Sequence, residues 1–323
     1  MRLLRGLYNP GLKEICHQGR CVATIGNFDG VHLGHQAIIA QVISEAKKRG
    51  LPSLVVVFEP QPMEFFKGDQ APARLMRFRE KCQALSAFDI DYIFCLKFDT
   101  KLSQLSAQAF IQKVLIEHLN IDHLVIGDDF RFGGDRLGDF SLLLEVGRQH
   151  GFSVENTPTV LENLEKHNLE KNSRVSSTYI RSLLSMGDFS RAEVVLGRPY
   201  GMMGRVIHGQ KLGRQLGFPT ANIALKRVKA PFLGVYAVSV FRHDKPSKQI
   251  QGVANIGIKP SVGHFKPLLE IHLLDFDEDL YGEKISVNFC KKIRDEKKFE
   301  GLDELVLQIK QDVLDTRAFF TGS

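Results

Sequence analysis

The sequence predicts an α/β protein in which a parallel-sheet domain is followed by a small antiparallel barrel or sandwich and a closing helix. Three observations predict this class. Strand and helix patterns alternate over the first half, which is typical of βαβ units. Short strand patterns separated by glycine and proline turns follow one another after Gly197. The chain of 323 residues is long for one hydrophobic core and comfortable for two.

Buried strands and amphipathic helices take turns between residues 21 and 150. Apolar runs predict strands at Cys21–Ile25, Ser53–Phe58, Asp91–Leu96 and His123–Ile126. Apolar residues at helical spacing predict helices over Gly34–Arg49, Phe140–His150 and Ser106–Leu119, the last with Ser106 as its N-cap. Because right-handed βαβ crossovers make such a sheet mostly parallel, its ligands bind beyond the carboxyl ends of the strands. Residues 27–35 and 127–134 both fall there.

The character of the chain changes near Gly197-Arg198-Pro199, after helical patterns at Thr178–Met186 and Phe189–Leu196. We place the domain boundary after Met186, which gives domains 1–186 and 187–323. The charged stretch Glu162–Ser173 predicts a surface loop. Strand patterns follow at Gly201–His208, Leu233–Phe241, Gly252–Ile256, Leu268–Phe276 and Lys284–Phe289. An amphipathic helix over Leu302–Ala318 closes the chain, with an apolar stripe of Leu302, Leu305, Val306, Ile309, Val313 and Leu314.

Composition and charge narrow the function classes. With 43% hydrophobic and 25% charged residues, the chain resembles ordinary soluble proteins, and no apolar stretch has the length of a signal peptide or a membrane span. Five cysteines without a Cys-x-x-Cys motif argue against a disulfide scaffold or a zinc ribbon and predict a reducing cytoplasm. The net charge of +6 favours anionic partners, among them nucleotides, flavin phosphates and RNA.

The stretch Gly26–His35 is the most informative part of the sequence, because a predicted strand gives way there to a predicted helix. A helix N-terminus presents unpaired N–H groups and partial positive charge, and glycine lets a phosphate approach closely. His32 and His35 add donors for the charge that develops when the α-phosphorus of a nucleoside triphosphate is attacked. We predict both as catalytic; the alternative is a metal pair or simple packing, and no third histidine is obvious. Nearby ATP contacts are predicted at Asn27, Phe28, Asp29 and Gly34.

Two further segments complete this predicted site. Hydroxyl groups and an arginine at the start of a helix can hold phosphate oxygens, with a plain N-cap and a solvated arginine as the alternative. The ATP contacts expected there are Ser176, Ser177, Thr178 and Arg181. Asp129 and Phe130 follow a strand and are expected to line the acceptor pocket, against the alternative of a turn residue and a core phenylalanine.

A second phosphate site is predicted in the glycine-rich, basic stretch 201–222, which has no P-loop motif. Backbone amides in such a loop can fold over phosphates, and the alternative is a barrel turn rich in glycine. The ATP contacts expected are Gly209, Lys211, Gly213, Arg214 and Gly217. In an extended chain Thr220 and Asn222 point to one face, where their oxygens suit Mg²⁺ bound with ATP phosphates. A strand-edge turn is the alternative for this pair.

Eight blocks of the sequence match one known family in the same order, namely Gly26–His35, Gly127–Gly133, Ser176–Arg181, Leu216–Asn222, Gly234–Tyr236, Asn255–Gly257, Glu270–Phe276 and Asp279–Gly282. On these blocks the chain resembles the bacterial bifunctional riboflavin kinase/FMN adenylyltransferase family over nearly its whole length. The resemblance implies a Rossmann-like nucleotidyltransferase domain with a parallel sheet, followed by a six-stranded antiparallel kinase barrel with a C-terminal helix. It also implies that ATP phosphorylates riboflavin to FMN in the barrel, and that ATP adenylylates FMN to FAD in the first domain with release of pyrophosphate.

The resemblance further implies residue roles and partners. By pattern alone Glu270 is one acid among several, and the resemblance makes it the favoured base for the hydroxyl proton. Arg294 resembles a position that closes over the flavin, against the alternative of a solvated arginine beside Asp295 and Glu296. Mg²⁺ and ATP would serve both reactions, with riboflavin and FMN as the other substrates. No nucleic acid, membrane or obligatory protein partner is expected.

Two segments depart from the family pattern. Gln61 stands where the family often has histidine, and glutamine cannot become cationic, so an ATP contact there is in doubt. Lys259 and Ser261 replace arginine and threonine, which removes bidentate contacts. Two other functions stay open from the residues. One is a nucleotidyltransferase for another phosphorylated acceptor, with the barrel as a binding module. The other is a basic RNA-binding protein, for which the second half lacks a clear basic stripe with interleaved aromatic residues.

Overall fold

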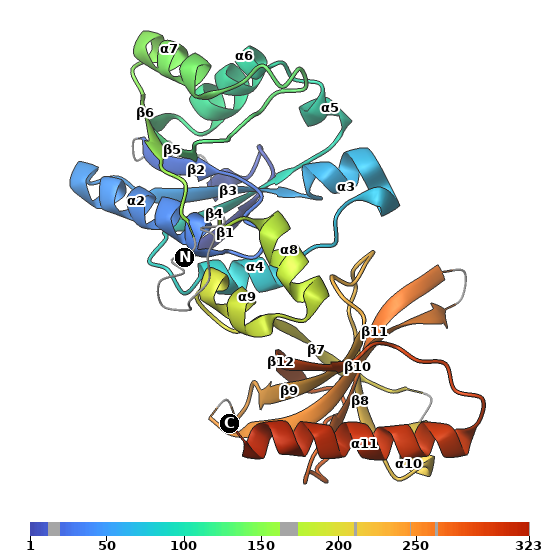
Figure 1. Cartoon of the computed structure of the whole chain (residues 1–323). Coiled ribbons are helices and arrows are strands. Elements are labelled where there is room, and N and C mark those ends of the chain that lie inside the picture. The colour runs from blue at the N-terminus through green and yellow to red at the C-terminus, as the bar shows by residue number, and fades with distance from the viewer. Residues whose placement is uncertain (12–19, 162–173, 210–211, 246, 262–263, 323) are drawn as a thin grey trace. The chain divides into compact units, whose positions relative to one another are not determined.

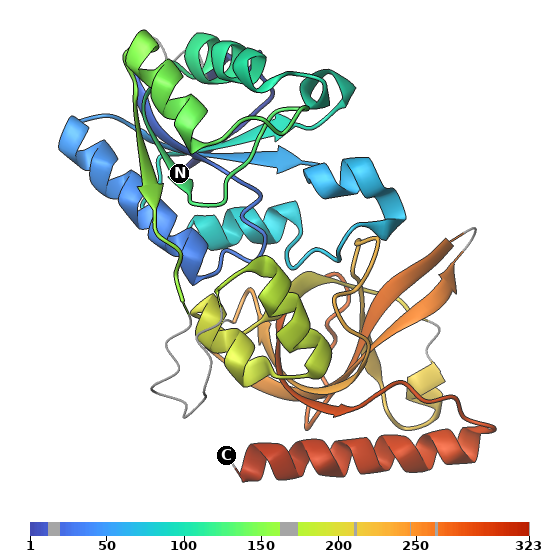
Figure 2. The same ribbon diagram turned by 45° about the horizontal axis from the view of Figure 1, so that its top comes forward.

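The computed structural model describes residues 1–11, 20–161, 174–209, 212–245, 247–261 and 264–322, and it divides the chain into two compact units (Figures 1 and 2). Unit 1 comprises Met1–Pro72 and Phe78–Ser176. Unit 2 comprises Ala73–Arg77 and Ser177–Ser323. The loop predicted at Glu162–Ser173 lies outside the described residues.

Unit 1 is built on a six-stranded sheet in the order β1-β4-β3-β2-β5-β6, and every neighbouring pair is parallel. The sheet confirms the predicted α/β class. The sequence did not predict the two edge strands, β1 and β6, because they are short and mostly exposed and neither shows an apolar run. The strands are β1 (Arg2–Arg5), β2 (Cys21–Ile25), β3 (Ser53–Glu59), β4 (Tyr92–Lys97), β5 (Ile121–Gly127) and β6 (Ser153–Thr157).

Helices cover both faces of this sheet, with α6 and α7 on one side and α2 on the other (Figure 1). Alternation along β2 explains the two cores, because Cys21, Ala23 and Ile25 join the α6–α7 side while Val22 packs with Val42 of α2. The predicted N-cap is present, since the hydroxyl of Ser106 accepts the N–H of Ala109. The elements are α2 (Leu33–Arg49), α3 (Pro62–Lys67), η1 (Gly68–Gln70), α4 (Phe78–Leu85), α5 (Thr100–Ser103), α6 (Ala107–Phe110), the π-helical η2 (Ile111–His118) and α7 (Phe140–His150).

Unit 2 contains a closed antiparallel barrel of six strands in the order β10-β11-β8-β7-β12-β9, which confirms the expected barrel. The sequence indicates β8 only as a short extended segment, but all five of its residues pair with β11, and Asn222 and Ile223 also pair with β7, which closes the barrel. The strands are β7 (Gly201–Ile207), β8 (Thr220–Ala224), β9 (Gly234–Arg242), β10 (Gln249–Ser261), β11 (His264–Leu273) and β12 (Lys284–Arg294). The helices of this unit are α8 (Ser177–Met186), α9 (Phe189–Leu196), α10 (Leu212–Gln215) and α11 (Leu302–Thr321).

The larger segment of unit 2 begins at Ser177, whereas the sequence placed the boundary after Met186. The difference has a packing cause. Phe189 of α9 lies in an aromatic cluster of the barrel with Phe232, Tyr236 and Phe289, and α8 packs on α9. Both helices therefore belong with the barrel.

A short segment from earlier in the chain, Ala73–Arg77, also belongs to unit 2. Its backbone carbonyls accept hydrogen bonds from side chains of that unit. Arg181 Nε donates to the oxygen of residue 73 at 2.6 Å, Tyr200 Oη to that of residue 75 at 2.9 Å, and Arg227 Nη1 to that of residue 74 at 3.2 Å. Three consecutive peptide groups are thus held by the unit to which the segment is assigned.

The closing helix α11 was predicted correctly and its apolar stripe in part, since Leu305 and Ile309 face the barrel and Val313 packs on a core cluster of unit 2. Leu302 and Leu314 are 57% and 59% exposed. The buried positions instead include Asp312 and Thr316, so the inward face is rotated relative to the predicted one and carries polar groups. Among the described helices, none combines the length and the apolar character that crossing a membrane would require.

A buried histidine joins the amino-terminal ends of β5 and β6. His123 is 4% exposed, and its Nδ1 lies 2.7 Å from Ser153 Oγ and 3.2 Å from Arg49 Nη2. Because a guanidinium can only donate, we assign the ring proton to Nε2, which lies 3.3 Å from Glu155. Burial and the nearby Arg49 lower the pKa of His123.

Glu45, His123 and Glu155 are, within the described residues, the one acid–histidine group close enough together to hold a metal ion. None of them is a predicted site residue. The proton assigned to Nε2 opposes ligation by this ring, and Lys48 and Arg49 already pair with Glu45. We therefore treat the group as a structural ion-pair network.

We expect the lowered pKa of His123 to make the folded protein sensitive to acid. As pH falls below the ordinary histidine value of about 6.5, the unfolded chain takes up a proton that the folded protein resists, so stability is lost. In His123→Gln this loss is absent, and its stability should rise relative to the wild type on acidification. Denaturant unfolding followed by circular dichroism between about pH 7 and pH 5 measures the difference. His150→Gln, at an exposed site of unit 1, is the control, and a pH-independent difference for His123→Gln would contradict the assignment.

Candidate active sites

The predicted histidine pair lies at the N-terminus of α2, directly after β2. His32 is the N-cap of α2, and its Nδ1 accepts the backbone N–H of His35 at 3.3 Å. The two imidazole rings stack at 3.6 Å between centroids with planes 19° apart. A Cβ at Gly34 would lie 3.2 Å from His32 Nδ1, so the absence of a side chain there leaves room for this ring. The structure therefore brings the pair together where helix N–H groups gather.

The turn before the pair has unusual backbone geometry. Phe28, Gly30 and Val31 all have positive φ, at 46°, 89° and 43°, and for a β-branched valine this is a strained conformation. Phe28 is buried with its ring 4.9 Å from that of His35, and Asp29 is buried beside it. Asn27 is exposed, and its carbonyl accepts a hydrogen bond from the buried Lys81. The strained turn thus gathers the predicted contacts around the histidines.

The predicted acceptor residues follow β5, which lies next to β2 in the parallel sheet, so both strands end at the same edge. A Cβ at Gly127 would lie 3.6 Å from Ile38 of α2 and 3.6 Å from Asp129. Asp129 is exposed and pairs with Arg174 at 2.7 Å. Phe130 is half-buried, stacks on Phe132 and packs on the core of unit 1. Part of the Phe130 side chain is therefore packed in the core, as the alternative interpretation expects.

Gln61 occupies the same edge of the sheet, just after β3. It is buried, and within the described residues its Nε2 has no hydrogen-bond partner. Gln61 directly precedes α3, and the carboxylate of Glu64 in this helix accepts the backbone N–H of Gln61. A buried amide donor thus stands at the position that departs from the family histidine.

The predicted contacts Ser176, Ser177, Thr178 and Arg181 straddle the division between the units. Ser176 ends unit 1, whereas the other three lie in the first two turns of α8 in unit 2. Arg181 uses its Nε for the carbonyl of Ala73. The ATP-binding role of these residues stays a prediction.

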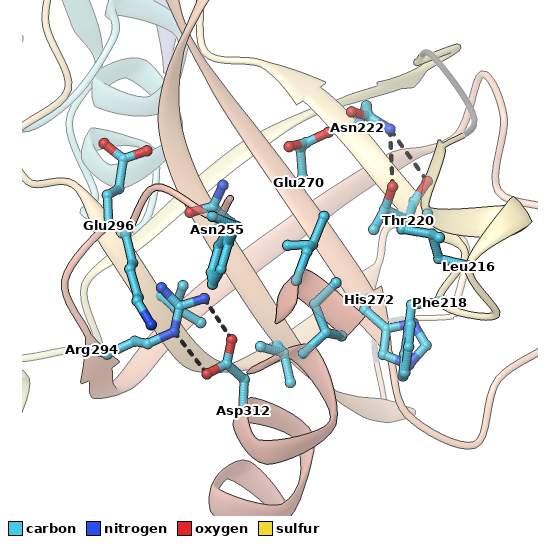
Figure 3. A pocket seen from close by; sticks show the side chains of 17 residues that line it. Leu216, Phe218, Thr220, Asn222, Asn255, Glu270, His272, Arg294, Glu296 and Asp312 are labelled. Atoms are coloured by element: carbon cyan, nitrogen blue, oxygen red, sulfur yellow. Dashed lines mark hydrogen bonds and ion pairs between the residues drawn. The ribbon is translucent and has the colours of Figure 1, made fainter. Parts of the chain in front are cut away.

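A cavity of about 310 Å³ opens in the barrel unit, within the size range of small-molecule sites (Figure 3). Strands β8 to β11, the end of β12 and helix α11 contribute its walls. Five predicted residues line it, namely Gly213, Thr220, Asn222, Glu270 and Arg294. Its other walls include Leu216, Phe218, Val235, Val253, Asn255, His272, Glu296, Lys297, Phe299, Leu305, Ile309 and Asp312.

Strand pairing sets Glu270 opposite Asn222 and His272 opposite Thr220. Asn222 is 4% exposed, and its Nδ2 donates to the carbonyl and the hydroxyl of Thr220 at 3.3 and 3.5 Å. Its Oδ1 is buried and has no hydrogen-bond partner among the described residues. A buried amide oxygen that lacks a donor, beside a threonine hydroxyl, fits a hard cation such as Mg²⁺.

The glycine-rich loop approaches this pair closely. A Cβ at Gly209 would lie 2.5 Å from Asn222 Nδ2, and one at Gly213 would lie 2.4 Å from the carbonyl oxygen of Phe218. Both positions therefore require a residue without a side chain. Gly217 has a φ of 86°, which glycine adopts freely. Lys211 and the side chains of Lys259 and Ser261 lie outside the described residues.

A second hollow of about 500 Å³ shares Thr220 with the first and includes the exposed Arg214. Its acidic wall is Asp277–Asp279. Arg242 anchors this wall: it is buried and bonds Asp244, Glu278 and Glu283 at 2.9, 2.5 and 2.9 Å. Hydrogen bonding to Arg242 lowers the pKa of Glu278.

Sequence reasoning missed Asp312, although a signal was present. Asp312 follows Leu305 and Ile309 at helical spacing, so a single acid completes an otherwise apolar face of α11. It pairs with Arg294 through two hydrogen bonds of 2.8 Å. Asn255 of β10, His272 of β11 and Glu296 after β12 were also missed, because the pattern of a strand does not show which of its faces lines a cavity.

Comparison with known proteins covers both units. The family model for FAD synthetase matches residues 14–178, and the model for riboflavin kinase matches residues 196–320. The chain is 47% identical over 320 residues to the bifunctional riboflavin kinase/FMN adenylyltransferase of Escherichia coli K12, covering 99% of this chain and 98% of that protein. The protein of the same name from Pseudomonas fluorescens is 49% identical over 325 residues, covering 100% and 99%.

A solved structure gives the same architecture. The chain is similar to a crystal structure titled a macrolide-efflux protein from Streptococcus pneumoniae, with a TM-score of 0.74 and 29% identity over 93% of this chain and 94% of that one. Two family models in the order of the two units, and relatives alike from end to end, lead to one assignment. The chain belongs to the bifunctional riboflavin kinase/FMN adenylyltransferase family.

Proposed function

We propose that this chain makes FAD in two ATP-dependent steps, phosphorylating riboflavin to FMN in unit 2 and adenylylating FMN to FAD in unit 1. The names of its relatives and the two family models support this proposal. The observation that carries it is the cavity in which a carboxylate, Glu270, stands opposite the buried amide of Asn222. We expect both reactions to take place in the cytoplasm, as the cysteine content predicts.

In the kinase step, Glu270 takes or orients the proton of the primary hydroxyl of riboflavin, and the hydroxyl oxygen attacks the γ-phosphorus of ATP. The bond from this phosphorus to the β,γ-bridging oxygen breaks, and ADP leaves. Thr220 and Asn222 would hold Mg²⁺ through the hydroxyl and Oδ1. When bound with ATP, this ion neutralises phosphate charge. The backbone of Gly209, Gly213 and Gly217, with Lys211 and Arg214, binds the phosphates.

In the adenylyl step, a phosphate oxygen of FMN attacks the α-phosphorus of ATP and pyrophosphate leaves. His32 and His35 donate hydrogen bonds to the oxygens that gain charge, together with the N–H groups at the start of α2. The centroids of the two stacked rings are 3.6 Å apart, which leaves no room for a ligand between them. Both imidazoles therefore bind the same anion. Within unit 1 we assign ATP contacts to Asn27, Phe28, Asp29, Gly34 and Ser176, and FMN contacts to Asp129 and Phe130.

The histidine pair should be needed for FAD formation alone. In His32→Ala or His35→Ala we expect adenylylation of supplied FMN to fall by about 10²-fold or more, the typical cost of removing one such donor, with riboflavin phosphorylation unchanged. Chromatography of reactions with ATP, Mg²⁺ and either riboflavin or FMN measures both rates. His150→Ala, at an exposed site of the same unit, serves as the control. Loss of both activities in a folded variant would refute independent sites.

The complementary pattern is expected in unit 2. In Asn222→Ala and Glu270→Gln, the conversion of riboflavin to FMN should fall by about 10²-fold or more while FMN is still adenylylated. Loss of a general base such as Glu270 typically costs about 10²–10⁴-fold. Asn222→Ala removes the amide oxygen that we assign to Mg²⁺. The same assay reports both steps. Asp303→Asn, exposed on α11, is the matched control. Kinase turnover close to that of the wild type in Glu270→Gln would exclude Glu270 as the base.

A further inference from the structure

An ion pair closes the end of the barrel cavity that lies away from Thr220 and Asn222 (Figure 3). Arg294 comes from the end of β12 and Asp312 from α11. Arg294 Nε and Nη2 each donate to one carboxylate oxygen at 2.8 Å, which is a bidentate pair. Glu270 lies between the two ends of the cavity (Figure 3). The pair is therefore separated from the groups assigned to phosphoryl transfer.

Asp312 holds the guanidinium of Arg294 in one orientation. Its side chain is almost fully buried, whereas that of Arg294 is partly exposed to the cavity and the solvent. Gln308 Nε2 donates to the same carboxylate at 3.0 Å, so Asp312 is fixed from its own helix as well. Because a buried carboxylate is unfavourable without its partner, the two side chains constrain each other.

The pair leaves donors of Arg294 for a ligand. A guanidinium has five N–H groups, and three are used, two by Asp312 and one, from Nη1, by the carbonyl of Asp295 at 2.9 Å. One N–H is left on each terminal nitrogen. The ring of Phe299 lies 5.7 Å from the guanidinium carbon, so the neighbouring wall is aromatic. This end of the cavity thus presents fixed donors beside apolar surface.

Charge at this end favours a neutral ligand. Arg294 is compensated by Asp312, and Lys297 is paired with Glu304 at 2.7 Å. Both cations that line the cavity therefore have a carboxylate partner, which disfavours a phosphate as their ligand. A flat, uncharged ring with carbonyl oxygens, such as the isoalloxazine ring of riboflavin, suits fixed donors and apolar walls.

We propose that Asp312 is a positioning residue for riboflavin, acting through Arg294: it fixes the guanidinium so that the two remaining N–H groups meet the carbonyl edge of the flavin ring. This inference rests on the proposed kinase function. It makes α11 part of the substrate site, although Asp312 itself does not bind the flavin. The ribityl hydroxyl then extends toward Glu270.

The first test is Asp312→Asn in the full chain, which keeps the shape and removes the charge. We expect the dissociation constant of riboflavin, followed by its fluorescence, and its KM to rise about tenfold, the loss of roughly one charge-assisted hydrogen bond, with kcat nearly unchanged. Adenylylation of supplied FMN, which we assign to unit 1, should stay at the wild-type rate, and circular dichroism reports whether unit 2 is folded. Asp315→Asn, exposed one turn away on α11, is the matched control.

A double-mutant cycle separates positioning from a structural role. If Asp312 acts through Arg294, the double variant Asp312→Asn/Arg294→Gln binds riboflavin as weakly as Arg294→Gln alone. Full additivity, or wild-type affinity in Asp312→Asn, would overturn the proposal. Should Asp312→Asn not fold, Arg294→Lys takes its place, since lysine keeps the charge without the bidentate geometry and wild-type affinity there is equally contrary. Binding needs no turnover, so a failed kinase assay with intact binding counts against the proposed function and not against the pair.

Discussion

Backbone pairing between strands decides where the site residues of both units lie. In the barrel, side chains alternate between two faces, so the register of β8 against β11 sets Thr220, Asn222, Glu270 and His272 at one cavity. A slip of one residue would turn Asn222 and Glu270 to opposite faces. In unit 1 the parallel direction of β2, β3 and β5 brings three segments to one edge of the sheet. The placement of the proposed site residues in each unit thus follows from main-chain hydrogen bonds.

The local structures that position the proposed site residues differ between the two units. Unit 1 relies on a turn and a helix end, where positive φ at Phe28 and Val31 brings the chain round so that His32 caps α2. The strain is local and is offset by burial of Phe28 and Val31 in the unit. Unit 2 relies on strand faces and on close approach of a glycine, since Gly209 reaches Asn222 only without a side chain. Turn geometry organises one site, and side-chain alternation organises the other.

Much of the fold followed from local pattern. The apolar run at Cys21–Ile25, the helix after it and the histidines between them depend on neighbours in sequence, and the structure places them as expected. What failed depends on distant partners. Asp312 resembles a surface acid until Arg294 is placed beside it. Leu302 and Leu314 fit the helical period but remain exposed, because the barrel is met by Leu305 and Ile309 together with Asp312.

The assignment of Ala73–Arg77 to unit 2 has a consequence for how the chain can be divided. The polypeptide passes from one unit to the other three times, so no single cut yields two self-sufficient halves. A fragment beginning at Ser177 would keep the barrel strands but leave Tyr200 and Arg227 without the carbonyl acceptors of residues 75 and 74. Gene fission between the two activities would therefore have to be accompanied by new acceptors for these donors, which favours keeping both catalysts on one polypeptide.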